Sequence, residues 1–150
     1  MVPGLRFGIA CLALLLAASA AAGADETPKP TEAPPAPLQL ELNRVQPLDG
    51  ACRLYLLFEN SGETSYASYV LDLVFFDREA VIDRRFSVEA GPLPADKTIL
   101  KQLDVPDLQC ERLGSLLLNA VSDCKRPSGG AGDCLEGLEL QNRTAIRFFK

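Results

Sequence analysis

The sequence predicts an all-β fold, an antiparallel β-sandwich of about seven strands braced by disulfide bonds. After residue 37, apolar residues alternate with polar ones along most of the chain, as they do along strands with one buried face. Turn-forming residues separate these stretches at intervals of roughly 8 to 12 residues, and no long amphipathic helical pattern interrupts them. Short strands punctuated in this way are typical of two packed sheets.

The first 24 residues predict an export signal. A basic residue, Arg6, precedes the apolar run from Phe7 to Leu16, and the small residues Ala22-Gly23-Ala24 end the segment. This pattern is typical of a signal peptide of the general secretion (Sec) route, with cleavage after Ala24. The run is shorter than the about 20 apolar residues that span a membrane, so no stable membrane insertion is expected after cleavage. The mature protein is therefore expected to be periplasmic or secreted.

A proline-rich linker follows at residues 25–37. It reads DETPKPTEAPPAP and holds no large apolar side chain. Such a segment cannot bury enough surface to offset the entropy lost on ordering it. A docking motif for a proline-reading groove is the alternative, but composition favours a disordered spacer. One folded domain is then expected at residues 38–150.

The first half of that domain predicts three strands. Residues 38–42 alternate with period two, and Asp49-Gly50 marks a turn. Residues 52–58 alternate again, with the even-numbered side chains on one apolar face. Residues 69–77 are apolar on both faces, which predicts a central strand covered on each side.

The second half is less regular. Residues 82–88 alternate, and residues 99–105 form another candidate strand whose apolar face is broken by Lys101. The segment Leu113 to Val121 fits either a strand or a short helix. Residues 143–149 predict a final strand.

Four of the five cysteines remain after processing, because Cys11 lies in the export signal. In an exported domain such cysteines form disulfide bonds. Four cysteines permit three pairings. The glycine-rich stretch between Cys124 and Cys134 favours closure of that pair, which leaves Cys52 to pair with Cys110. The two other pairings stay open.

The composition excludes several classes of function. The chain contains no histidine, so no Ser–His or Cys–His catalytic pair can form. No Cys-x-x-Cys spacing or Cys/His cluster predicts a redox or zinc site. A net charge of −5 disfavours nucleic-acid binding, which needs a basic face. We therefore expect no catalytic residues, no metal, no cofactor and no nucleic-acid partner.

Carboxylate pairs keep one catalytic alternative open. Glu59 with Glu63, or Asp72 with Asp83, could act as acid and base in a hydrolase. Asp77 could bind a cation together with Asp72 or Asp83. Solvated surface carboxylates are the commoner case, and an aspartate at a turn commonly bonds its own backbone.

One block of the chain resembles a known family. Its elements are Asn60-Ser61-Gly62, Phe75-Phe76-Asp77 and the loop Pro92 to Thr98. Together they resemble the middle of bacterial Ig-like or fibronectin-like modules of the FxLYD type. The whole chain is similar to short exported proteobacterial proteins of unknown function. The resemblance implies an Ig-like sandwich that acts as a non-catalytic module.

Two functional hypotheses follow. The first is an exported module that binds an envelope protein or serves as a scaffold. The second is a small periplasmic inhibitor or a carboxylate-based hydrolase. Tyr66, Tyr69, Arg84 and Arg85 are candidate contact residues, because tyrosine and arginine are enriched in interface hot spots. In the competing interpretation the tyrosines cap the core and the arginines protect an edge strand. The partner and the oligomeric state stay open.

Overall fold

A computed structural model describes residues 37–130 and 134–150. The predicted export signal and all but the last residue of the predicted linker lie outside the described residues. Within them the chain forms eight strands and one short 3₁₀ helix, so the all-β class is confirmed. The elements are β1 (Leu38–Leu48), β2 (Ala51–Asn60), β3 (Ser68–Asp77), β4 (Ile82–Glu89), β5 (Lys97–Pro106), η1 (Cys110–Arg112), β6 (Leu113–Lys125), β7 (Leu138–Asn142) and β8 (Arg147–Phe149).

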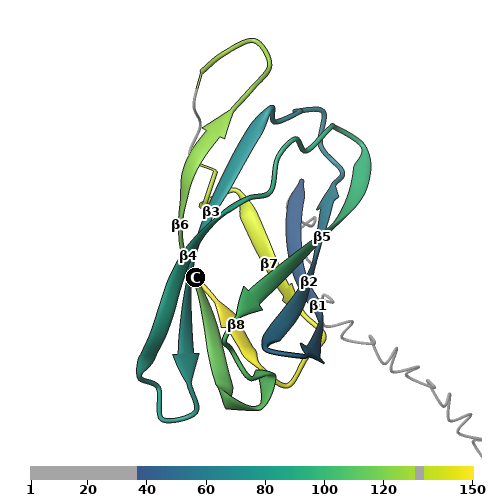
Figure 1. Ribbon diagram of the computed structural model, residues 1–150. Coiled ribbons are helices and arrows are strands. Elements are labelled where there is room, and N and C mark those ends of the chain that lie inside the picture. The colour runs from purple at the N-terminus through teal and green to yellow at the C-terminus, as the bar shows by residue number, and fades with distance from the viewer. Residues whose placement is uncertain (1–36, 131–133) are drawn as a thin grey trace, which may run out of the picture. The chain divides into compact units, whose positions relative to one another are not determined.

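The strands form two sheets that enclose one core (Figure 1). The β1 sheet has the order β5-β2-β1-β7, and the β3 sheet has the order β4-β3-β6-β8. The largest fully buried side chains come from both sheets, with Phe58 on β2 and Tyr69 and Phe75 on β3. Full burial of an apolar side chain of this size contributes about 1.5–3 kcal/mol, so facing rows of such residues hold the sheets together.

Most of the predicted strands are present, with changed limits. The strand expected at 38–42 continues to Leu48, and its register with β2 shifts between Leu42 and Arg44. The ambiguous segment that begins at Leu113 is a strand, β6. The expected final strand is reduced to β8, and β7 is a strand that the sequence pattern did not predict.

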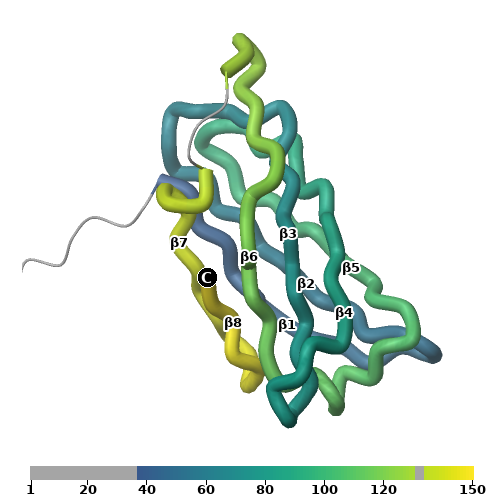
Figure 2. Tube along the Cα trace, turned by 90° about the vertical axis from the view of Figure 1, so that its left-hand side faces the viewer, coloured from purple at the N-terminus to yellow at the C-terminus, as the bar shows by residue number. Residues whose placement is uncertain are grey.

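The prediction of purely antiparallel sheets is wrong at two places among the described strands. β7 runs parallel to β1, and β8 runs parallel to β6. The cause is the path of the chain. β6 ends at the end of the sandwich where β1 begins, so the chain enters β7 in the direction of β1. It then reverses through residues 143–146 and joins the other sheet in the direction of β6. Figure 2 shows both short strands along one side of the sandwich.

Two disulfide bonds brace the domain. Cys52 on β2 is bonded to Cys110 in η1, with Cα atoms 5.1 Å apart. Cys124 on β6 is bonded to Cys134, with Cα atoms 6.4 Å apart. Both distances lie in the usual range for disulfides. The two pairs are those predicted from the glycine-rich stretch between Cys124 and Cys134. Disulfides indicate an oxidising compartment. No helix among the described residues is long and apolar enough to cross a membrane.

Candidate functional site

β3 is apolar on both faces, and only the inner face packs against the other sheet. The side chains of Tyr69 and Phe75 point inward and are fully buried in the core. Val74 and Phe76 point to the opposite side, where the described part of the chain supplies no third layer (Figure 1). Val74 is nevertheless only 7% exposed and Phe76 is half-buried. Much of the outer face is therefore buried by neighbouring side chains even without a third layer, as the prediction of a covered central strand requires.

The outer face carries a cluster of apolar side chains, most of them buried or half-buried, which we call the outer patch. Its members are Val74, Phe76, Ile82, Leu117 and Phe149. The register of the sheet brings them together, since Phe76 lies opposite Ile82, and Leu117 lies between Val74 and Phe149. The rings of Phe76 and Phe149 stack with centroids 6.4 Å apart. Ile82 is the most exposed member, at 63%.

Two arginines flank the outer patch. Arg85 lies opposite Val74 and makes a bidentate ion pair with Asp72, with distances of 2.7 Å from Nε and 2.5 Å from Nη2 to the carboxylate. Asn119 Nδ2 donates a third hydrogen bond to this carboxylate at 2.7 Å. The Arg85 side chain is nevertheless 64% exposed. On the other side, the guanidinium of Arg147 lies 4.3 Å from the ring centroid of Phe149.

The carboxylate of Asp72 is held charged beneath this surface. Asp72 is only 3% exposed, yet its pKa is lowered, chiefly by the hydrogen bonds from Arg85 and secondarily by that from Asn119. These interactions outweigh the loss of hydration. The ion pair therefore fixes the Arg85 guanidinium in one orientation while leaving it accessible.

We expect the free energy of unfolding to fall as the pH drops below about 4, the ordinary carboxyl range. The pKa values of Asp72 and Glu89 are lowered in the folded protein, the latter mainly by hydrogen bonds from the backbone amides of Tyr69 and Gly91. A carboxylate of this kind stabilises the fold above its unfolded pKa, and the stabilisation is lost as the pH falls through the folded pKa. Urea unfolding at neutral and acid pH measures the loss. An Asp72→Asn variant with an unchanged pH dependence would contradict the assignment to Asp72.

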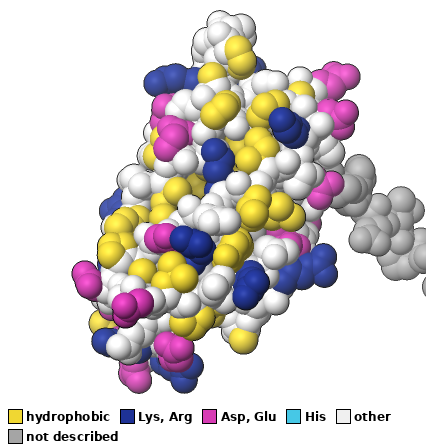
Figure 3. Space-filling model, turned by 45° about the vertical axis from the view of Figure 1, so that its right-hand side comes forward, with side chains coloured by type: hydrophobic (Ala, Val, Ile, Leu, Met, Phe, Trp, Pro, Cys, Tyr) yellow, Lys and Arg dark blue, Asp and Glu magenta, His cyan; other side chains and the backbone are white. Residues whose placement is uncertain are grey.

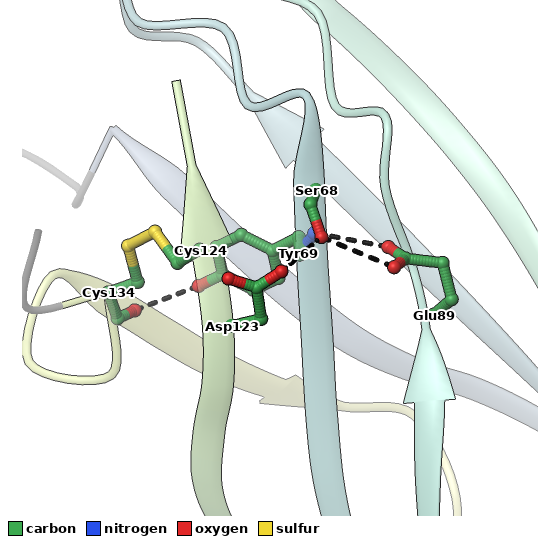
Figure 4. The surroundings of a disulfide bond; sticks show 6 residues. All are labelled: Ser68, Tyr69, Glu89, Asp123, Cys124 and Cys134. Carbon is green, nitrogen blue, oxygen red and sulfur yellow. Dashed lines mark hydrogen bonds between the residues drawn. A yellow bond between two sulfur atoms is a disulfide. The ribbon is translucent and has the colours of Figure 1, made fainter. Parts of the chain in front are cut away.

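The expectation that Tyr69 forms part of a contact surface is wrong. Tyr69 is fully buried, and its hydroxyl donates a hydrogen bond of 2.8 Å to the carbonyl oxygen of Cys134 (Figure 4). Tyr66 is half-buried and packs edge-on against Tyr69, with ring centroids 5.3 Å apart. The tyrosine pair caps the core at the end of β3 remote from the outer patch. This placement agrees with the competing interpretation, in which the two tyrosines cap the core.

The two arginine candidates have different roles. Both arginines lie on β4, which is an edge strand. The interpretation that they protect an edge requires this position. Arg84 pairs with Asp83 and donates hydrogen bonds to the carbonyl oxygens of Pro106 and Asp107. It therefore links the edges of the two sheets. Only Arg85, of the four candidate contact residues, lies beside the outer patch.

Asp72 and Asp83 are held in separate ion pairs, while the pair Glu59 with Glu63 stays a prediction. Asp72 is bonded by Arg85, and Asp83 is bonded by Arg84. Asp77 accepts hydrogen bonds from the backbone amides of Glu79 and Val81 at 3.1 and 2.8 Å. It therefore closes the β3–β4 turn, as the turn interpretation holds. Among the described residues, no cluster of three or more acidic or cysteine side chains could hold a metal ion.

A cavity of about 290 Å³ lies beside this turn, against η1. It is lined by Asp77, Arg78, Glu79, Glu111 and Arg112. Its lining therefore holds two arginines beside three carboxylates, and Asp77 is already bonded within the turn.

The sequence reasoning missed Phe76, Leu117, Phe149 and Arg147 as site residues. The signal for Phe76 was present, because residues 69–77 are apolar on both faces. The other three lie far along the chain and join Phe76 only through the pairing of β3, β6 and β8.

No family model, curated protein or solved structure matches this chain. The resemblance to FxLYD-type modules stays a prediction.

Proposed function

We propose that the mature protein is a non-catalytic, exported module that binds a protein partner through the outer patch. The observation that carries the proposal is the cluster of outward apolar side chains on β3, β4, β6 and β8, over which no third layer is described and in which Ile82 is 63% exposed. Contiguous apolar surface rimmed by polar residues marks interaction sites on soluble proteins. An Ig-like sandwich of the FxLYD type would be a suitable scaffold for such a site.

The proposed partner offers apolar side chains together with carboxylates. Arg85 and Arg147 flank the outer patch, although the chain as a whole has a net charge of −5. The ion pair with Asp72 orders Arg85 in advance, which lowers the entropic cost of using it in an interface. Arginine and aromatic residues in this arrangement are the usual hot spots of protein interfaces.

The proposed location is the periplasm or the cell exterior. The disulfides support an oxidising compartment. The pattern of residues 1–24 supports export, and the proline-rich linker would act as a spacer between the processed end and the domain. An envelope protein is therefore the expected kind of partner.

Affinity capture from the envelope fraction tests the proposal. We expect the mature protein to retain a partner, and the double variant Ile82→Glu/Arg147→Glu to retain at least about tenfold less, because it removes one exposed apolar anchor and reverses one flanking charge. Arg126→Glu is the control, since it adds negative charge on an exposed loop remote from the outer patch. Thermal unfolding verifies that the variants are folded.

Equal capture by the double variant and the wild type would show that the outer patch is not the binding site. Failure to capture any partner, together with turnover of a polysaccharide or a peptide by the purified protein, would refute the non-catalytic module and favour the hydrolase alternative.

A further inference from the structure

β5 is a long edge strand with one unpaired side. It spans 10 residues and pairs with β2 along its whole length without a register shift. No described strand lies on its other side, because β5 ends the order of the β1 sheet. The backbone donors and acceptors on that side are therefore available to a further strand.

The neighbouring edge, β4, is better protected than β5. The register of β4 with β3 is irregular between Phe75 and Phe76, and an irregularity of this kind disrupts strand addition. Arg84 also reaches across from β4 to the carbonyl oxygens at the end of β5. The segment Lys97 to Leu103 of β5 has neither protection.

The side chains of β5 divide by face. Leu100 points outward and is 49% exposed, next to the half-buried Leu57 of β2. Lys97 and Lys101 lie on the inward face, and the Lys101 ammonium donates a hydrogen bond of 3.1 Å to the carbonyl oxygen of Gly91. Neither lysine makes an ion pair within the described part of the chain. Figure 3 turns the β5 side of the domain forward and shows hydrophobic side chains interspersed with both basic and acidic ones.

A second copy of the chain is a poor occupant of this edge. In an antiparallel pair, residues directly opposite each other share a face. Lys101 of one copy could then oppose only Lys97, Ile99, Lys101, Leu103 or Val105 of the other. Every register places the ammonium against another ammonium or against an apolar side chain, and both arrangements are unfavourable.

We infer that the β5 edge is a second binding site, distinct from the outer patch, which takes an extended acidic segment of a partner protein as an added strand. The backbone of the segment would continue the hydrogen-bonded ladder beyond β5. Its side chains would alternate, with apolar residues beside Leu100 on the outer face and carboxylates beside Lys97 and Lys101 on the inner face.

A capped, fluorescein-labelled peptide of ten alternating valine and glutamate residues is the probe. We expect it to raise the fluorescence anisotropy on binding to the mature protein, and to slow hydrogen exchange of the backbone amides at residues 97–103. The same peptide with alternate backbone nitrogens methylated cannot form the ladder and should not bind. Equal binding of the methylated peptide, or no change in exchange along β5, would overturn the inference.

Charge reversal on the edge tests the side-chain part of the inference. Lys101→Glu and, separately, Lys97→Glu should weaken binding about fivefold to tenfold, since each replaces an attraction by a repulsion. A peptide of alternating valine and lysine residues should bind to these glutamate variants more tightly than it binds to the wild-type protein. Arg126→Glu and Ile82→Glu/Arg147→Glu should leave the affinity unchanged. A loss of binding in Ile82→Glu/Arg147→Glu, with Lys97→Glu and Lys101→Glu unaffected, would place the peptide on the outer patch instead.

Discussion

Replacement of Cys52 and Cys110 together by alanine is expected to lower the free energy of unfolding by about 4 kcal/mol. The bond joins residues 58 positions apart, so it removes much conformational freedom from the unfolded chain. Small domains are stabilised by about 5–15 kcal/mol in total, so the loss would be a large fraction of that stability. Urea denaturation of the purified, oxidised variants measures the change.

The second disulfide supplies the matched control. Cys124 and Cys134 are separated by 10 positions, and their joint replacement by alanine should cost less, about 2.7 kcal/mol on the same entropic argument. A larger loss for this short loop than for the long one would mean that loop closure does not govern the contribution of the two bonds.

Tyr69→Ala is expected to cost about 4 kcal/mol, in the range for truncating a buried aromatic side chain. The ring is fully buried and lies edge-on to Phe58, with centroids 6.2 Å apart. Tyr66 also packs edge-on against it. Truncation would open a cavity where the sheets meet near the second disulfide.

The conservative variant separates the ring from the hydroxyl. Tyr69→Phe keeps the packing and should cost only about 1 kcal/mol, the usual value of one hydrogen bond, here to the carbonyl oxygen of Cys134. Tyr66→Phe should change the urea midpoint little, because Tyr66 contributes chiefly its ring to this cluster. Equal destabilisation by Tyr69→Phe and Tyr69→Ala would contradict the packing role of the ring.

The sequence predicts those parts of the fold that depend on local pattern. Period-two alternation located β1 and β2, a run that is apolar on both faces located β3, and Asp49-Gly50 located the β1–β2 turn. The alternation also placed Tyr69 on the same face as Leu71 and Leu73, so its burial could have been inferred. The glycine-rich stretch after Cys124 favoured the disulfide pairs because a short flexible loop closes at a low entropic cost.

The remaining features depend on tertiary placement. β7 has only five residues, too few for a periodic signal to stand out, and its direction beside β1 is set by where β6 ends. The outer patch joins Phe76 to Phe149 across β6, and no local pattern reports which distant strands become neighbours. The role of Asp72 likewise requires Arg85 and Asn119 from the two strands beside it.

The bond between Cys124 and Cys134 has a consequence for resistance to proteases. The exposed residues Lys125 and Arg126 lie within the loop that it closes. A trypsin-like enzyme that cut between them would sever the backbone but would not release Cys134–Lys150. That piece carries one strand of each sheet and would stay covalently attached to β6. A nicked molecule could therefore keep both sheets complete, and the cut would become visible only under reducing conditions.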